Sequence, residues 1–336
     1  MISFTQRLGI DLGTCNIRIF QQRKGIVINE PATVAVSADN RILAMGEDAK
    51  NMLGKTPEAI SAIYPLRDGV IASFRATEAM LRHYIIKLCG AFRLFGVEVM
   101  ISVPVGITST ERRAVIDAAT HAGARRVYLI KEPIAAALGA EVPIANPSGS
   151  MIIDIGGGTT EVAVISLGDI VAFSSARVGG NRFDQAIVNY IRKKHNLIIG
   201  QQTAEDLKIK IGAAMPTEAN PTMEISGSNA ITGLPEVMDI VAYEIVEALR
   251  EELKEVIVTV KTVLQKTPPE LASDIIDKGI VLTGGSSLLR EFDKLLTKVT
   301  GVPCYRAEDP LLCTVRGAAL AVDHLDEYKR AVIAGK

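Results

Sequence analysis

Two segments of this chain repeat one arrangement of an apolar strand, an aspartate, glycines and a hydroxyl group. The first is residues 8–16, with Asp11 after the strand, and the second is residues 151–161, with Asp154 in the same place. Each continues into a second apolar run, so each is predicted to be a β-hairpin with its polar residues at the turn. Glycine lets backbone N–H groups approach an anion, and a nearby carboxylate holds a hydrated cation. Two such turns facing each other are predicted to clamp a polyphosphate and its Mg²⁺.

A third glycine-rich turn offers similar chemistry. Gly284, Gly285 and Ser286 follow a strand-like run at 279–283 and precede a predicted helix at 288–297. A strand, a glycine turn and a helix N-terminus together place backbone amides against an anion or a base. Such turns are common, so this one is informative only beside the two turns that carry aspartates. Together the three are predicted to form the walls of one nucleotide site.

Glu132 is a candidate for orienting a water molecule. It lies between a strand-like run at 127–130 and an alanine-rich helix at 134–140. Pro133 suits the first turn of that helix, so Glu132 is expected at the end of the strand, pointing toward a cleft. A carboxylate there orients a water for attack on a γ-phosphate. The other interpretation, which the local residues favour, is a helix cap.

Glu205 and Lys208 are three residues apart on a predicted helix at 203–212, so they share one face. On an isolated helix this spacing favours a solvated ion pair. Beside a nucleotide, the same side chains are interpreted as contacts to the ribose and the adenine. The sequence shows neither a Ser-His-Asp set nor a metal-ligand cluster, so phosphate chemistry is the chemistry it supports.

The elements that position these residues follow from the apolar pattern. Strand-like runs alternate with amphipathic helices, which predicts an α/β fold. Strands are expected at 8–20, 25–29, 33–38 and 98–103, and a helix at 76–88. Thr108 and Glu111 form a capping box for a further helix that ends at Gly123. Residues 214–236 are expected to be loop-rich and poor in strand, and helix is expected to resume over 237–266.

The best linker candidate is 142–149, which contains two prolines and a glycine without helical periodicity. The second hairpin begins directly after it. A motif repeated on each side of a hinge predicts an internal duplication, with a cleft between the two copies.

Composition limits the class of protein. The net charge is −1, from 37 basic and 38 acidic residues, so nothing favours nucleic acid as a partner. The four cysteines lie far apart, which is typical of reduced thiols in a cytosol rather than a zinc site or disulfide framework. The N-terminus lacks the pattern of a signal peptide, and no window approaches 18 uncharged apolar residues. We therefore expect a cytoplasmic protein whose membrane contact is peripheral.

In this order, the three turns resemble those of the actin, sugar-kinase and DnaK-type chaperone superfamily, and within it the MreB family of bacterial actin homologues. Further segments resemble that family, at residues 29–31, 49–57, 67–72, 106–108, 267–271 and 274–277. The resemblance covers essentially the whole chain. It implies an actin-like ATPase fold of two duplicated RNase H-like domains flanking a nucleotide cleft, each with a smaller subdomain. The implied domains are 1–144, with 318–336 packing back onto it, and 145–317, with a variable subdomain at about 181–244.

The resemblance also implies roles for individual residues around Mg²⁺-ATP or ADP. The first phosphate-binding turn would be formed by Asp11, Gly13, Thr14, Cys15 and Asn16, and the second by Gly156, Gly157, Gly158 and Thr159. Asp11 and Asp154 would hold Mg²⁺, largely through its waters, and Asp154 would share the catalytic role with Glu132. Glu205 and Lys208 would contact the nucleoside, and Gly284, Gly285 and Ser286 the purine side.

Three positions depart from the family pattern. Cys15 replaces the usual alanine, which suggests sensitivity to oxidation, and Ser286 replaces the usual third glycine. Lys131 stands where the family usually has glutamate, so its cation is expected to bind phosphate or to pair with Glu132 and lower its basicity. Slow ATP turnover follows from that pairing. Two alternatives remain, a filament protein that binds ATP without useful hydrolysis and a small-molecule kinase of the same fold.

The same resemblance implies a cytoskeletal ATPase whose paired filaments lie under the inner membrane and direct cell-wall synthesis to maintain rod shape. The implied partners are other copies of the chain and the cell-wall elongation machinery, including RodZ and MreC/MreD-type proteins. Leu94 and Phe95 lie in an apolar stretch at 90–97 that matches the family's membrane-insertion loop. The other interpretation of these two residues is packing in a core.

Overall fold

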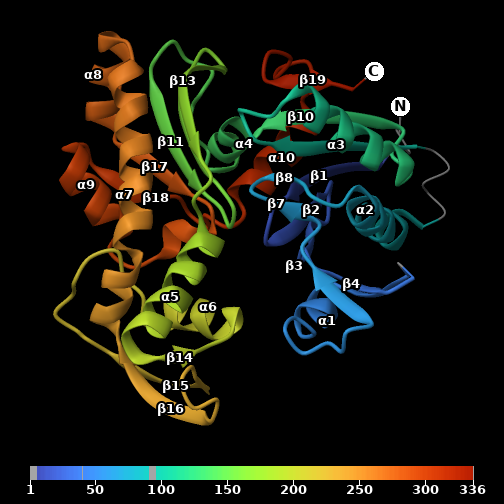
Figure 1. Cartoon of the computed structure of the whole chain (residues 1–336). Helices are drawn as coiled ribbons and strands as arrows, with labels where there is room; N and C mark the ends of the chain where they lie inside the picture. The colour runs from blue at the N-terminus through green and yellow to red at the C-terminus, as the bar shows by residue number, and fades with distance from the viewer. Residues whose placement is uncertain (1–5, 40, 91–95, 336) are drawn as a thin grey trace.

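The protein is described by a computed structural model that covers residues 6–39, 41–90 and 96–335. Two β-sheets form the frame of two lobes that lie side by side (Figure 1). The first sheet has the strand order β19-β10-β9-β1-β2-β3. Its strands are β1 (Gln6–Leu12), β2 (Asn16–Gln21), β3 (Gly25–Pro31), β9 (Val97–Val103), β10 (Arg126–Lys131) and β19 (Val332–Ala334).

The second sheet has the order β13-β12-β11-β17-β18. Its strands are β11 (Ser150–Ile155), β12 (Thr160–Ser166), β13 (Asp169–Ala176), β17 (Ile280–Thr283) and β18 (Cys304–Arg306). Every residue of β11, β12 and β17 is buried, which explains their nearly continuous apolar sequences.

The two predicted hairpins are confirmed, and they share one internal design. β1 pairs antiparallel with β2, and β11 pairs antiparallel with β12. At the turns, the amide of Gly13 donates to the carbonyl of Asn16 over 3.1 Å, and that of Gly156 donates to Thr159 over 2.8 Å. Each hairpin is extended by a parallel strand, β9 beside β1 and β17 beside β11. The two sheets therefore repeat one supersecondary unit around each aspartate.

Helices α4 (Glu132–Gly139) and α10 (Cys313–Asp323) pack against each other between the sheets (Figure 1). Each packs on the sheet that it does not directly follow in the chain, α4 on β11 and α10 on β1. Their close approach depends on glycine, since a Cβ at Gly139 would overlap the carbonyl of Cys313 and one at Gly317 that of Ala135. Small residues at this crossing thus allow the two halves of the molecule to join.

Other helices cover the outer faces. α2 (Phe74–Cys89) and α3 (Ser109–His121) pack in the first lobe, while α7 (Ala242–Lys266) and α8 (Pro269–Lys278) flank the second sheet (Figure 1). The predicted capping box is present, because Thr108 and Glu111 each bond to the other's backbone amide. Within residues 6–39, 41–90 and 96–335, no helix has both the length and the apolar character needed to cross a membrane.

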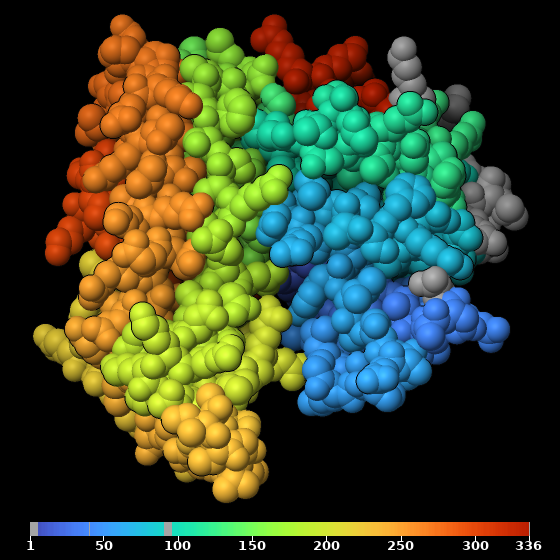
Figure 2. Space-filling view, in the orientation of Figure 1, coloured from blue at the N-terminus to red at the C-terminus, as the bar shows by residue number. Residues whose placement is uncertain are grey.

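Smaller elements extend each lobe. The first lobe carries β4 (Val34–Ser37), β5 (Ile42–Met45), β6 (Ile60–Ile63), β7 (Leu66–Arg67), β8 (Val70–Ile71) and α1 (Glu47–Lys50). The second carries α5 (Gly180–His195), β14 (Leu197–Ile198), α6 (Gln201–Lys210), β15 (Thr222–Asn229) and β16 (Pro235–Val241). In Figure 2 the blue segment of the first lobe lies apart from the orange segment of β15 and β16 at the bottom of the view.

Three sequence predictions of elements are wrong. Residues 214–236 are not poor in strand, because β15 and the start of β16 lie there. Helix does not resume at 237, because β16 continues to Val241 and α7 begins at Ala242. These strands join β14 in a small sheet whose residues are mostly exposed or partly buried, so the alternating apolar pattern is weak. The predicted helix at 288–297 is divided, with a 3₁₀ turn at Gly285–Leu288 before α9 (Phe292–Thr300).

Candidate functional site

One cavity of about 500 Å³ lies between the two lobes. It is lined by residues from the hairpin turns of both sheets, from α4, α5 and α6, and from the turn after β17. All the predicted nucleotide-site residues are in this lining, namely Asp11, Gly13, Thr14, Cys15, Asn16, Glu132, Asp154, Gly156, Gly157, Gly158, Thr159, Glu205, Lys208, Gly284, Gly285 and Ser286. The predicted membrane residues Leu94 and Phe95 lie outside the described residues.

The two hairpin turns meet at close range. A Cβ added to Gly157 would overlap the sulfur of Cys15, and one added to Gly158 would lie 2.6 Å from Oγ1 of Thr14. Only glycine therefore lets the second turn lie against the first. The Cys15 Sγ also donates a hydrogen bond to Oδ1 of Asn181 over 2.9 Å, which ties the first turn to α5. Burial raises the pKa of the Cys15 thiol to about 11, so it remains protonated at neutral pH, which opposes the expected sensitivity to oxidation.

The two aspartates are buried and held in equivalent ways. Oδ1 of Asp11 accepts a hydrogen bond from Ser102 on β9 over 3.4 Å, and Oδ1 of Asp154 accepts one from Thr283 on β17 over 3.1 Å. Asp154 accepts a second bond from Thr314 of α10, whereas Asp11 pairs with the guanidinium of Arg18. Burial raises the pKa of both carboxyls, and the charge of Asp11 helps to raise that of Asp154 to about 7.

These residues fit a hydrated Mg²⁺. Two buried carboxylates that repel each other are stabilised by a cation between them. In the described part of the chain, no three or more His, Cys, Asp or Glu residues are grouped as a complete metal site. A site with few protein ligands suits Mg²⁺, which retains several waters and is usually completed by phosphate oxygens.

Glu132 is the first residue of α4 and contributes to the cavity wall. Burial raises its pKa well above the ordinary value of 4.5, and the charges of Glu161, Asp154 and Asp11 raise it further. Glu161 accepts hydrogen bonds from the amide of Val105 over 2.9 Å and from the Ser175 hydroxyl. Glu132 thus faces the site as one of several carboxyl groups rather than serving only as a helix cap.

Lys131 does not take the place that its sequence suggests. Its Nζ lies 3.4 Å from Oδ1 of Asp169, which is on β13, and it is not part of the cavity lining. The expected pairing of Lys131 with Glu132, and its expected contact with phosphate, are therefore wrong. Lys131 is the last residue of β10 and Glu132 is the first of α4, and these adjacent side chains have different surroundings.

Glu205, Lys208 and Ile209 lie on one face of α6, toward the cavity. Glu205 and Lys208 do not form the ion pair that their spacing allows. Lys208 Nζ lies 2.6 Å from Oδ1 of Asp184 on α5, and Glu205 Oε2 lies 2.9 Å from Nζ of Lys50 on α1, across the cleft. Each side chain thus pairs with a residue from another helix instead of with its neighbour on α6. Ser286 donates to the carbonyl of Gly156 over 2.8 Å and so joins the third turn to the second.

Sequence reasoning missed several polar residues around the cavity, namely Arg18, Glu161, Asn181, Asp184, Thr283 and Thr314. Arg18 and Glu161 were detectable, because the residue opposite each aspartate in an antiparallel hairpin follows from the turn. Asp184 and Thr314 carry no such signal, since their positions depend on how distant helices pack.

Comparison with known proteins agrees with this geometry. A family model described as MreB/Mbl protein matches residues 5–330. The chain belongs to the MreB/Mbl family. It is similar to the cell shape-determining protein MreB of Escherichia coli (strain K12), at 48% identity over 331 residues, or 97% of this chain and 95% of that protein. It is also similar to the cell shape-determining protein Mbl of Bacillus subtilis (strain 168), at 45% identity over 97% of this chain and 98% of that protein.

Solved structures of this family confirm the actin-like fold. MreB5 of Spiroplasma citri bound to ADP has a TM-score of 0.92 and 36% identity, covering 98% of this chain and 99% of that one. The same protein bound to AMPPNP has a TM-score of 0.92 and 37% identity, covering 97% and 98%. MamK in a double helical filament has a TM-score of 0.79 at 19% identity, which shows the shared fold alone. The resemblance drawn from the three turns is confirmed.

Proposed function

We propose that this chain is a cell-shape ATPase of the cytoskeleton, which binds Mg²⁺-ATP between its lobes and assembles into filaments. The observation that carries the proposal is the pair of matching hairpins, which bring Asp11 and Asp154 and their glycine turns to one cavity. The nucleotide-bound structures of MreB5 and the names of the similar proteins support it.

The proposed roles follow from position in the cavity. The backbone amides of both glycine turns bind the phosphates, and Asp11 and Asp154 hold the waters of Mg²⁺. When bound, Mg²⁺ neutralises charge on the phosphate oxygens. Glu205 and Lys208 contact the nucleoside, while Gly284, Gly285 and Ser286 lie at the purine. The joined turns and the buried strands behind them keep these groups in fixed positions before the nucleotide arrives.

Glu132 orients the attacking water and accepts its proton in this proposal, with Asp154 beside it. Slow ATP turnover is still expected, although Lys131 does not pair with Glu132. The reason is now the pKa of Glu132 itself. Burial and then the surrounding carboxyls raise the pKa of Glu132, so they disfavour the ionised form that accepts a proton. Hydrolysis then loosens the subunit contacts that ATP binding favours.

We propose the domain limits 1–144, with 318–336 packing back, and 145–317, with a variable part at about 181–244. The pairing of β19 with β10, in the first sheet, supports the return of the C-terminal segment.

We also propose a peripheral location at the inner face of the cell membrane, with RodZ and MreC/MreD-type proteins as partners in wall synthesis. Head-to-tail contacts between copies are the kind that open filaments require.

Titration calorimetry of ATP with Mg²⁺ tests the binding step. The wild-type chain is expected to bind saturably, while Asp154→Asn is expected to bind at least tenfold more weakly because its carboxylate is lost. The control Asp169→Asn removes an exposed carboxylate outside the cavity and is expected to bind as the wild type does. No heat of association with folded wild-type protein would contradict the proposal.

Sedimentation of the same samples separates the alternatives. Pelleting that requires ATP, together with phosphate release, supports the ATPase filament. Pelleting without phosphate release would select an ATP-binding filament protein, and ADP formation that requires an added hydroxyl compound would select a small-molecule kinase.

Membrane contact has its own test. Liposome co-sedimentation of Leu94→Ser/Phe95→Ser is expected to fall several-fold, since each buried apolar side chain contributes about 1.5–3 kcal/mol. The loss is expected to be largest for polymer, which presents many loops at once. Undiminished pelleting with liposomes would reject this loop as the anchor.

A further inference from the structure

Arg18 is a cavity residue that the sequence analysis did not use. It lies opposite Asp11 in the register of β1 and β2, and the residue in the equivalent position opposite Asp154 is Glu161. Because the two hairpins share one design, these are matching positions with opposite charges. Asp11 therefore lies opposite the guanidinium of Arg18, whereas Asp154 lies opposite a second carboxylate, that of Glu161.

The side chain of Arg18 is enclosed and only partly used by the protein. Its exposed fraction is 13%, and Nη1 lies 3.0 Å from Oδ2 of Asp11. The Nε atom is buried and has no hydrogen-bond partner among the described residues. The bond from Nη1 to Asp11 is the one hydrogen bond that the guanidinium makes among the described residues, so its other N–H groups at the cavity wall are suited to an anionic ligand.

Charge around the cavity makes this guanidinium important. Asp11, Glu132 and Asp154 all contribute to the lining, and the ligand expected there is itself anionic. Among the described residues, the lining contains two other cations. Lys208 is bonded to Asp184 and the carbonyl of Gly180 on α5, and Arg290 donates to the carbonyls of Gly212 and Ile211. Arg18 is therefore the cation that directly opposes the carboxylates of the hairpins.

We propose that Arg18 is a phosphate-binding residue that shares the neutralising role of Mg²⁺, so that the site binds a nucleoside polyphosphate with a reduced requirement for divalent metal. The guanidinium holds Asp11 in place and offers its remaining N–H groups to phosphate oxygens. Replacing it leaves Asp11 without its cation, and metal must then supply the whole neutralisation. This inference rests on the proposed nucleotide binding.

The test compares ATP affinity with Mg²⁺ and with excess EDTA, by calorimetry on the full chain. For Arg18→Met, affinity is expected to fall by no more than about threefold with Mg²⁺, but by about tenfold or more in EDTA, since a charge-assisted contact is lost. Arg18→Lys, which keeps the charge, is expected to restore most of the affinity in EDTA. The matched control is Arg126→Met, which breaks a guanidinium pair with Glu98 in the same sheet, outside the cavity.

A second measurement uses the metal alone. Titration of nucleotide-free protein with MgCl₂ is expected to show tighter binding to Arg18→Met than to wild type, because a competing cation has been removed. A merely structural role predicts weaker metal binding instead.

Equal losses of ATP affinity with and without metal, or no loss in either, would overturn the inference while leaving the proposed function intact. If the wild type binds no ATP under either condition, the proposed function itself fails. Should Arg18→Met not fold, Arg18→Gln serves in the same comparison.

Discussion

At the scale of single residues, the site combines groups that sequence motifs identify with groups that only packing supplies. Asp11 and Asp154 follow from local patterns, because the same strand, aspartate and glycine turn occurs twice in the chain. The opposite outcomes for Glu132 and Lys131 show the limit of that reasoning. They are neighbours in sequence, yet one lies in the cavity wall and the other pairs with Asp169 outside it.

Glu132 provides the residue-scale prediction. Glu132→Gln keeps the size of the side chain but removes a group able to accept a proton, so steady-state phosphate release is expected to fall at least tenfold. ATP binding is expected to persist. The control Glu141→Gln changes an exposed glutamate just after the same helix and is expected to leave release unchanged. Phosphate release by Glu132→Gln at the wild-type rate would remove Glu132 from its proposed role.

At the scale of elements, the crossing of α4 and α10 depends on two glycines. In an open helix, Gly→Ala stabilises by about 1 kcal/mol. For Gly317→Ala the opposite is expected, a loss of about 1–3 kcal/mol, because the new methyl group would overlap the backbone of Ala135. Denaturant unfolding measures the change. Gly106→Ala, where nothing lies within 4 Å of the added carbon, is the control, and equal effects of the two substitutions would contradict the prediction.

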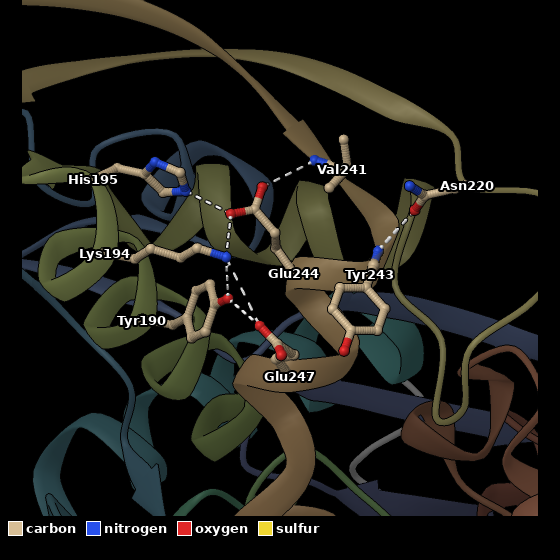
Figure 3. A network of polar contacts seen from close by, with 8 residues as sticks. All are labelled: Tyr190, Lys194, His195, Asn220, Val241, Tyr243, Glu244 and Glu247. Atoms are coloured by element: carbon tan, nitrogen blue, oxygen red, sulfur yellow. Dashed lines mark hydrogen bonds and ion pairs between the residues drawn. The ribbon is translucent and has the colours of Figure 1, made fainter.

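A polar network joins α5 to the start of α7 (Figure 3). Oε1 of Glu244 lies 2.6 Å from Nε2 of His195 and 3.1 Å from Nζ of Lys194. Tyr190 donates to Glu247 over 2.6 Å in the same network. Burial alone would raise the pKa of Glu244, but the bonds from His195 and Lys194 outweigh it and hold the pKa below the ordinary value of 4.5.

The lowered pKa of Glu244 predicts a pH-dependent contribution to stability. For a carboxyl of this kind, the contribution is present above the unfolded-state pKa and is lost as the pH falls through the folded-state pKa. Glu244→Gln is therefore expected to lower the free energy of unfolding by about 1.5–3 kcal/mol at pH 7, and by progressively less as the pH is lowered from the ordinary pKa of 4.5 through the folded-state pKa. Denaturant unfolding in a series of buffers from pH 7 downward measures it. Glu251→Gln, which is exposed on the same helix, is expected to have little effect across this series, and a deficit for Glu244→Gln that stays constant with pH would refute the argument.

At the scale of the whole molecule, a contact across the mouth of the cleft links the lobes. Nζ of Lys50 lies 2.9 Å from Oε2 of Glu205, and Nε2 of Gln202 donates to the carbonyl of Lys50 over 3.1 Å. These bonds join α1 in the first lobe to α6 in the second. Together with the bond from Cys15 to Asn181, they favour the closed arrangement of the lobes.

In the Lys50→Ala variant, the cleft is expected to be open for a larger fraction of the time, because the ion pair with Glu205 is lost. A partly exposed ion pair contributes about 0.2–1 kcal/mol, so a fluorescent ATP analogue is expected to dissociate about 1.4- to fivefold faster. Stopped-flow displacement measures the rate. Lys55→Ala, which removes an exposed lysine close by in the sequence, is the control. If both variants release the analogue at the wild-type rate, the contact does not control closure.

The amino-acid sequence by itself determined the hairpins, the three turns, the α/β class and the family, because each rests on short-range patterns of glycine, aspartate and apolar residues. It did not predict β15 and β16, whose weak pattern is stabilised by pairing within a small exposed sheet. Only the tertiary structure decided which charges face each other, as Lys208 with Asp184, Glu205 with Lys50, and Lys131 with Asp169. The physical reason is that ion pairs form between side chains that packing brings within a few ångströms, and packing brings together residues far apart in the chain.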